Sequence, residues 1–230
     1  MLTELQKKVF LTELKNYKKR YLIKKYLELD ESATRLMINT FLTNVLGYTE
    51  LDEIKTEYSI KNTYADYVIQ IGKKRHIVIE VKAIQINLNE NHIRQSLNYA
   101  ANEGIEWVLL TNGKQWMLFR VLFEKPIKHS LVFNLDLSID EDFNKASSAM
   151  QYLTKKCVIS GDLEKYWSRY VAIKPKNLCK HLYNPTILKS LKHMLKNEVG
   201  INFSDEDLFE AVHQIVITKI DKQKPKFSIK

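Results

Sequence analysis

Cysteine is scarce in this 230-residue sequence, which contains two, Cys157 and Cys179. They stand far apart, without a CxxC spacing and without a neighbouring group of histidines. A disulfide framework needs more cysteines, and a zinc site needs ligands at short, regular spacing. We therefore exclude both kinds of site and expect two reduced, buried thiols.

Long apolar stretches are also missing. No window approaches the roughly 18 apolar residues that a membrane-spanning helix requires. The amino-terminal stretch MLTELQKKVFLTELKNYKKR lacks the apolar core of a signal peptide. No Ser-His-Asp or Cys-His arrangement can be read from the sequence either. We therefore expect a soluble, cytoplasmic protein that does not associate with membranes through a spanning segment.

Positive charge, in contrast, is in excess. Lys and Arg number 36 against 27 Asp and Glu, a formal net charge of +9, and the pI is near 9.3. Eight of these cations lie between Lys7 and Lys25, in a segment with helical periodicity. The excess favours a polyanionic partner, either a nucleic acid or an anionic membrane surface. For the amino-terminal cluster, a solvated basic helix face is the simpler explanation.

The order of apolar patterns predicts an α/β fold in which helices flank a mixed sheet. The expected helices are 4–29, 29–48, 89–104, 140–156, 161–171, 185–198 and 204–218, and the expected strands are 54–60, 66–71, 75–84 and 128–137, with a hairpin around Asn112-Gly113. The chain accordingly divides into a basic helix (1–28), a core (29–138), a helical region (139–220) and a basic tail (221–230).

The stretch RHIVIEVKAI, residues 75–84, is a buried-strand pattern that contains Glu80 and Lys82. Charged side chains are rarely buried without a partner. The preceding strand carries Asp66, and a turn centred on Lys73 places Asp66 directly opposite Glu80. Residues paired in this way point to the same face, with Cβ atoms roughly 4.5–5.5 Å apart.

Two adjacent carboxylates repel each other unless a cation binds them or one takes up a proton. Such oxygen ligands suit Mg²⁺ or Mn²⁺, which also accept phosphate oxygens. Lys82 would then orient or deprotonate an attacking water and offset charge on a phosphate. The alternative is purely structural: a salt bridge of Lys82 with Glu80 or Asp66 on a half-covered sheet face.

Asp66 followed by Glu80-Val81-Lys82 resembles the D…(D/E)xK signature of the PD-(D/E)XK nucleases. The segments ESATRLMINTFLTNVLGY, ADYVIQIGKKRHIVIEVKA, RQSLNYA and VLLTNGKQWMLFRV follow in order. Together they are similar to the amino-terminal nuclease domain of type I restriction enzyme R subunits, over about residues 28–125. The resemblance implies a restriction-endonuclease-like core and Mg²⁺-dependent endonuclease cleavage of DNA, in restriction or in defence against mobile elements.

The resemblance also assigns roles to individual residues. It implies that Asp66 and Glu80 ligate the metal together with the backbone carbonyl of Val81. It implies that Lys82 is the catalytic lysine.

Three further residues match the family less specifically. Gln95 and Tyr99 match a QxxxY motif and share one face of the helix after the charged strand, where they would orient DNA or a catalytic water. On spacing alone they fit an ordinary polar helix flank equally well. Glu31 matches an acidic residue that sometimes completes the metal site, or it is a helix-start carboxylate stabilised by the macrodipole.

Two departures from the family pattern matter. Ala65 stands where the signature has proline, a substitution common in this branch. The sequence contains no GxxxxGK[ST] phosphate loop, so any cleavage is independent of ATP within this chain or uses a partner's motor. The alternative function is a catalytically silent nuclease-fold module that binds nucleic acid or recruits a helicase or methyltransferase. The carboxy-terminal helices are the expected place for a protein partner, a homodimer contact or DNA.

Overall fold

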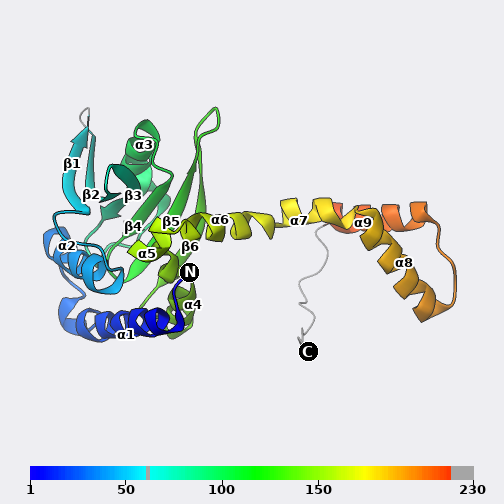
Figure 1. The fold of residues 1–230 in the computed structure, drawn as a ribbon, viewed down its shortest axis with the longest axis horizontal. Coiled ribbons are helices and arrows are strands. Elements are labelled where there is room, and N and C mark those ends of the chain that lie inside the picture. Colours follow the sequence, from blue (N-terminus) through cyan, green and yellow to red (C-terminus); the bar gives the residue numbers. More distant parts are fainter. Residues whose placement is uncertain (61–62, 219–230) are drawn as a thin grey trace. The chain divides into compact units, whose positions relative to one another are not determined.

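The described part of the chain contains one mixed sheet whose strands lie in sequence order, β1-β2-β3-β4-β5-β6 (Figure 1). This computed structural model describes residues 1–60 and 63–218. Only β3 and β4 run parallel, and the crossover between them is the 3₁₀ turn η3 and helix α3. The predicted α/β fold is confirmed. The bounds are β1 Ile54–Ile60, β2 Thr63–Ile71, β3 Lys74–Val81, η3 Glu90–Ile93, α3 Arg94–Asn102, β4 Trp107–Thr111, β5 Gln115–Leu122 and β6 Lys128–Asp136.

Helix α3 covers one face of the sheet. Its buried residues Tyr99 and Ala100 belong to an apolar cluster with residues of four strands. The strand residues of this cluster are Ala65, Val68, Val78, Val108, Leu110, Met117, Phe119 and Val121. Side chains alternate along β3, so Glu80 lies on the same face as Val78 and is directed towards α3.

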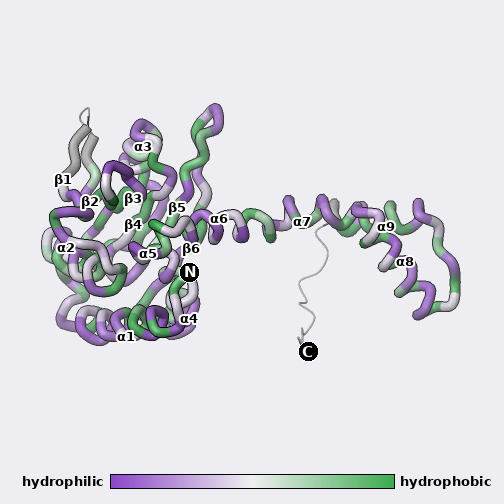
Figure 2. Tube along the Cα trace, in the orientation of Figure 1, coloured by the Kyte–Doolittle hydropathy of each residue, from purple (hydrophilic) through white to green (hydrophobic). Residues whose placement is uncertain are grey.

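The amino-terminal helices cover the other face. Trp116 neighbours Met117 on β5 and therefore points away from α3. Its ring packs against Phe41 at a tilt of 32°, with 4.2 Å between centroids. Phe41 begins the π-helical turn η2 (Phe41–Val45), which continues α2 (Glu31–Thr40). Tyr17 of α1 (Glu4–Tyr21) packs edge-on against Phe41 at 4.8 Å. Polar and apolar residues alternate along α1 in Figure 2, in keeping with a helix buried on one side.

The predicted register of the β2–β3 hairpin is confirmed near the site. Tyr67 pairs with Ile79, Val68 with Val78 and Ile69 with Ile77, and continuing this register places Asp66 opposite Glu80. An irregularity after Ile69 shifts the pairs close to the turn by one residue. Strand β3 ends at Val81, earlier than predicted, although the Lys82 N–H still donates to the Thr111 carbonyl at 2.9 Å.

The first helix is shorter than predicted. Helix α1 ends at Tyr21, and a short 3₁₀ turn, η1 (Lys24–Tyr26), follows. The helix buries Phe10, Leu14 and Tyr17, but no residue from 18 to 33 is buried. Without an apolar stripe to pack, helical periodicity alone does not hold the segment in a helix.

Asn112 shapes the predicted hairpin and also the loop that follows β3. Its side chain is fully buried. Its Oδ1 accepts the N–H groups of Lys114 and Gln115 at 3.2 and 2.7 Å. Its Nδ2 donates to the carbonyls of Ile84 and Ile86 at 3.3 and 2.8 Å. The loop after Lys82 is thus fixed to the β4–β5 turn.

The chain forms two compact units, and the first extends from Met1 to Trp167. It includes α4 (Asp140–Ala149), η4 (Met150–Leu153), α5 (Lys155–Ile159) and the start of α6 (Asp162–Ala172). Contacts hold these helices in the first unit: Tyr48 Oη donates to the Leu153 carbonyl at 2.7 Å, and Arg120 of β5 pairs with Glu164 at 2.7 Å. The division expected between residues 138 and 139 therefore does not coincide with this boundary.

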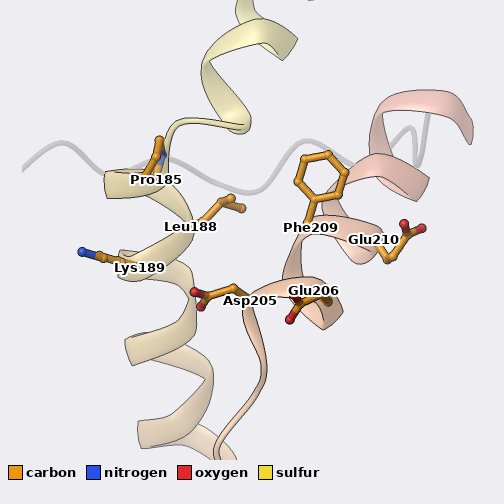
Figure 3. Close-up of a pocket in the computed structure, with 7 residues that line it drawn as sticks. All are labelled: Pro185, Leu188, Lys189, Asp205, Glu206, Phe209 and Glu210. Atoms are coloured by element: carbon orange, nitrogen blue, oxygen red, sulfur yellow. The ribbon is translucent and has the colours of Figure 1, made fainter.

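The second unit begins at Ser168 and is helical in its described part, with α7 (Pro175–Leu182), α8 (Pro185–Val199) and α9 (Asp205–Thr218). Helix α7 was not predicted. The predicted capping box of α9 is confirmed by reciprocal bonds of 2.9 and 3.0 Å between Ser204 and Asp207. A cavity of about 380 Å³ lies between α8 and α9 (Figure 3) and is lined by Pro185, Leu188, Lys189, Asp205, Glu206, Phe209 and Glu210.

Both cysteines carry free thiols, and Cys157 is buried whereas Cys179 is half-buried. Within residues 1–60 and 63–218, no helix is at once long enough and apolar enough to cross a membrane. The predicted basic tail, 221–230, lies outside the described residues.

We predict that Asn112→Ala lowers the free energy of unfolding by about 2–4 kcal/mol, because several buried backbone groups lose their partner. Urea denaturation measures this change. Asn98→Ala, an exposed position on α3, is the matched control and should stay within about 0.5 kcal/mol of the wild type. A similar loss in both variants would contradict the role of Asn112.

We also predict that stability falls as the pH rises above about 10. Burial raises the pKa of Tyr17 and of Tyr48 far above the usual range. The folded state therefore keeps these protons while the unfolded state loses them, so the stabilisation is complete below pH 10 and is lost above it. Tyr48→Phe should flatten this decline in urea denaturation between pH 8 and 11. An unchanged slope would rule out Tyr48 as a source.

Candidate active site

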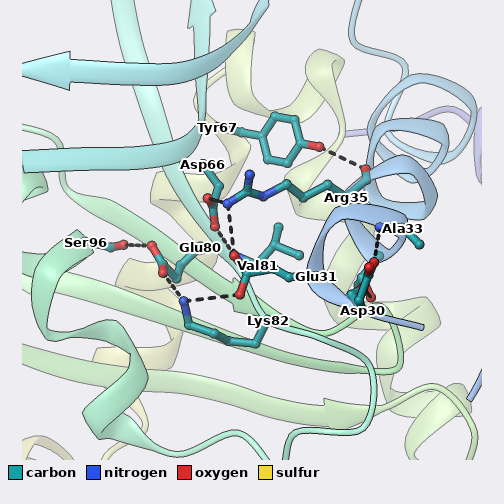
Figure 4. A network of polar contacts seen from close by, with 11 residues as sticks. Asp30, Glu31, Ala33, Arg35, Asp66, Tyr67, Glu80, Val81, Lys82 and Ser96 are labelled. Carbon is teal, nitrogen blue, oxygen red and sulfur yellow. Dashed lines mark hydrogen bonds and ion pairs between the residues drawn. The ribbon is translucent and has the colours of Figure 1, made fainter. Parts of the chain in front are cut away.

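Asp66, Glu80 and Lys82 meet where β2 and β3 lie side by side (Figure 4). Glu80 and Val81 are the last residues of β3, and Lys82 follows directly. Asp66 Oδ2 accepts the backbone N–H of Val81 at 2.7 Å, which fixes the carboxylate across the strand pair. The structure thus brings together the three residues that the sequence motif singled out.

Glu80 is held by two partners. Its side chain is only 10% exposed, and its Oε1 forms an ion pair with Lys82 Nζ. Its Oε2 accepts a hydrogen bond of 2.5 Å from Ser96 Oγ of α3. Ser96 is fully buried, so the bond fixes the rotamer of Glu80. Sequence reasoning did not single out Ser96, and a lone serine on a helix flank carries no signal of such a contact.

Glu31 reaches the site from the first turn of α2. The helix begins after Asp30, whose carboxylate caps it by accepting the Ala33 N–H at 2.8 Å. Glu31 Oε2 lies 3.9 Å from Lys82 Nζ, and Glu31 Oε1 lies 3.0 Å from Arg35 Nη2. Glu31 is therefore both a carboxylate at a helix start and a member of the charged group, and a metal-binding role for it stays a prediction.

Arg35 is the member of the site that the motif did not include. It stands one turn after Glu31 on α2 and forms ion pairs with both Glu31 and Asp66. The four-residue spacing from Glu31 is a sequence signal that could have placed it on the same helix face. Around the site, acids and bases alternate in the order Glu80, Lys82, Glu31, Arg35 and Asp66.

The charges around Lys82 favour its ammonium form. Desolvation lowers the pKa of Lys82, but its hydrogen bond with Glu80 and the charges of Glu80, Glu31 and Asp66 outweigh this and raise it. Tyr67 Oη donates to the Arg35 carbonyl at 2.9 Å, which links β2 to α2. Burial raises the pKa of Tyr67 to about 12, so this donor persists at neutral pH.

Gln95 and Tyr99 lie in different surroundings, although both are on α3. Gln95 is exposed, whereas Tyr99 is 1% exposed and belongs to the apolar cluster under the helix. Ser96, next to Gln95, is the α3 residue that contacts Glu80. The predicted roles of Gln95 and Tyr99 towards DNA or water stay predictions.

The charged group has the donor chemistry of a hard-cation site, but each carboxylate is engaged. Asp66 contacts Arg35 and the Val81 N–H, and Glu80 contacts Lys82 and Ser96. Among the described residues, no three His, Cys, Asp or Glu side chains are arranged so that they could hold a metal ion. The oxygen donors of Asp66, Glu80 and Glu31 fit Mg²⁺ or Mn²⁺ in kind, and a metal would have to compete with the present cationic partners for these oxygens.

Residues 30–131 match the family model described as Type I restriction enzyme R protein N terminus. The matched segment begins at the N-cap of α2 and ends within β6, so it contains the whole charged group. Neither the curated proteins nor the solved structures gave a match to the chain. This segment therefore resembles the amino-terminal region of type I restriction enzyme R subunits, as its motifs predicted, and the resemblance indicates a restriction-related role.

Proposed function

We propose that this protein is a Mg²⁺- or Mn²⁺-dependent endonuclease of the PD-(D/E)XK type that hydrolyses DNA phosphodiester bonds, in restriction or in defence against mobile elements. One observation carries the proposal: Asp66 of β2 lies beside Glu80 and Lys82 at the end of β3, inside the segment that matches the restriction family. The mixed sheet with α3 on one face and α2 on the other is compatible with a restriction-endonuclease-like core.

In this proposal the acidic residues of the site bind the cation, and the basic residue acts on the water and the phosphate. Asp66 and Glu80 supply carboxylate oxygens, and the Val81 carbonyl adds a neutral one. A divalent cation on these oxygens would stabilise the negative charge that develops on the scissile phosphate. Lys82, held as an ammonium by its acidic neighbours, would orient the attacking water and offset phosphate charge. Ser96 keeps Glu80 in position.

The basic character of the chain supports DNA as the substrate. A net charge of +9 gives sequence-independent attraction to phosphates, and such binding weakens steeply with salt. Because the sequence contains no phosphate loop, we propose that cleavage does not require ATP within this chain, or that a partner supplies the motor.

A catalytically silent binding module is the second candidate, and one observation favours it. Arg35 and Lys82 already neutralise Asp66 and Glu80, which is also how a purely structural ion-pair network would be arranged. Such a module would bind nucleic acid, or recruit a helicase or methyltransferase, without cutting.

We predict that the full chain nicks or linearises supercoiled DNA in the presence of Mg²⁺ or Mn²⁺ and that EDTA abolishes this activity. Asp66→Asn and Lys82→Met should each lower the cleavage rate by about 100-fold or more, the size of effect seen when charge stabilisation is removed from a site. Gel assays of initial rates measure this, with linear DNA and RNA as parallel substrates.

Asp52→Asn and Lys73→Met are the matched controls, because both positions are exposed and lie outside the site. They should cleave at the wild-type rate. Cleavage that survives both Asp66→Asn and Lys82→Met would refute the assignment of the site. Salt-sensitive DNA binding without cleavage by the wild type would favour the silent module, and cleavage of RNA alone would change the substrate.

A further inference from the structure

We propose that Arg35 is a positioning residue that couples DNA binding to metal loading. Its guanidinium pairs with Asp66 and Glu31, and we propose that it transfers to a DNA phosphate when substrate binds. Asp66 is then released for the cation. This inference rests on the proposed nuclease function of the same site.

The contacts of Asp66 indicate that Arg35 and a cation would share one binding position. Its Oδ2 accepts the Val81 N–H, and its Oδ1 is paired with Arg35 Nη2. Each oxygen of Asp66 therefore has a partner. A divalent cation at Oδ1 would lie beside the guanidinium, and two neighbouring positive charges repel each other. Arg35 and a cation would therefore compete for Asp66.

The surroundings of Arg35 allow such an exchange. Its side chain is 32% exposed, compared with 12% for Asp66, so Arg35 is the more accessible of the two partners even though its Nε is buried. The Arg35 backbone carbonyl accepts the Tyr67 hydroxyl at 2.9 Å, which anchors α2 to β2. The exchange therefore needs a change of rotamer and no movement of the helix.

A phosphate is the partner that Arg35 would take in place of Asp66. The planar guanidinium binds carboxylates and phosphates by the same bidentate geometry. Lys82 differs, because it pairs with the nearly buried Glu80 and also approaches Glu31, and it has a role in the reaction. Arg35 has no such role in the proposed reaction, and it pairs with two carboxylates of the site, Glu31 and Asp66.

Binding linkage gives a measurable consequence. If DNA removes Arg35 from Asp66, DNA must raise the affinity for metal, and metal must raise the affinity for DNA by the same factor. Couplings between sites are typically about 5- to 150-fold. Without Arg35 the Asp66 carboxylate would be open to the cation from the start, so metal would bind more tightly in the absence of DNA. The coupling would then fall to the part that comes from direct contact between cation and phosphate.

We predict that Arg35→Gln raises the Mn²⁺ affinity of the DNA-free full chain about 10-fold, a change within the range of site couplings. Electron paramagnetic resonance of free Mn²⁺ measures this affinity. Arg75→Gln is the matched control, because Arg75 forms an ion pair with Glu103 in the same unit, and it should bind Mn²⁺ like the wild type. Arg35→Lys, which keeps the charge, should lie between wild type and Arg35→Gln.

The coupling itself is measured as DNA affinity, by fluorescence anisotropy of a labelled duplex with and without Ca²⁺ at constant ionic strength. The wild type should bind DNA at least 5-fold more tightly with Ca²⁺, and Arg35→Gln should show a smaller ratio, because only the direct contact between cation and phosphate remains. An effect of lost charge alone would tighten Mn²⁺ binding but leave this ratio at its wild-type value, and this outcome would overturn the proposal. A wild type whose DNA affinity does not change with Ca²⁺ would overturn it even if Arg35→Gln does not fold.

Failure of the inference and failure of the proposed function give different results. If Asp66→Asn binds Mn²⁺ as tightly as the wild type, the metal site is not at Asp66 and the proposed function fails with it. If Mn²⁺ binding depends on Asp66 while Arg35→Gln matches the wild type and Ca²⁺ leaves DNA affinity unchanged, the site stands and the role of Arg35 is refuted.

Discussion

The Glu80 carboxylate sits at the end of a strand whose neighbouring residues, Val78 and Val81, are completely buried. Removing a carboxylate from water costs several kcal/mol unless charges and donors replace the lost hydration. Here Lys82 and Ser96 replace it, and Lys82 in turn approaches Glu31. The need to neutralise Glu80 therefore constrains three elements, β3, α3 and α2, of which α2 lies far from the other two in the sequence. Apolar packing brings these elements to the sheet, and the ion pairs then select their relative position.

The parallel pairing of β3 with β4 makes this arrangement possible. An antiparallel neighbour would follow β3 through a short turn, but a parallel one requires a crossover. The crossover puts α3 on the face of Glu80, with Ser96 in contact and Tyr99 in the core. Asn112 holds the loop that leads into the crossover by bonds to the carbonyls of Ile84 and Ile86. The loop that follows β3 is thus held in place directly beside the site.

Sequence reasoning succeeded where a feature depends on neighbouring residues along the chain. The β2–β3 register follows from alternation and a short turn, and the pairing of Tyr67 with Ile79 confirms it. Sequence reasoning was less successful where packing between residues far apart in the sequence determines the structure. Helix α1 ends at Tyr21 because no buried residue follows until Thr34, and α5 joins the first unit through bonds to residues near Tyr48. Ser96 was missed for the same reason, since nothing local distinguishes a serine that meets a carboxylate across the fold. The spacing of Arg35 from Glu31 was a local signal for their pairing, but no local signal indicated the contact of Arg35 with Asp66.

The alternation of acids and bases would also reconcile the acidic site with the polyanionic substrate proposed for it. Asp66, Glu80 and Glu31 alone would repel a phosphate, and the repulsion would be strong in a partly buried site where screening is weak. Arg35 and Lys82 reduce the excess of negative charge. Their side chains are 32% and 24% exposed, whereas those of Asp66 and Glu80 are 12% and 10% exposed and that of Glu31 is 41% exposed. A phosphate that approached the site would therefore meet the two cations together with Glu31 before it met Asp66 and Glu80, so the two cations would offset the repulsion from the less exposed acids.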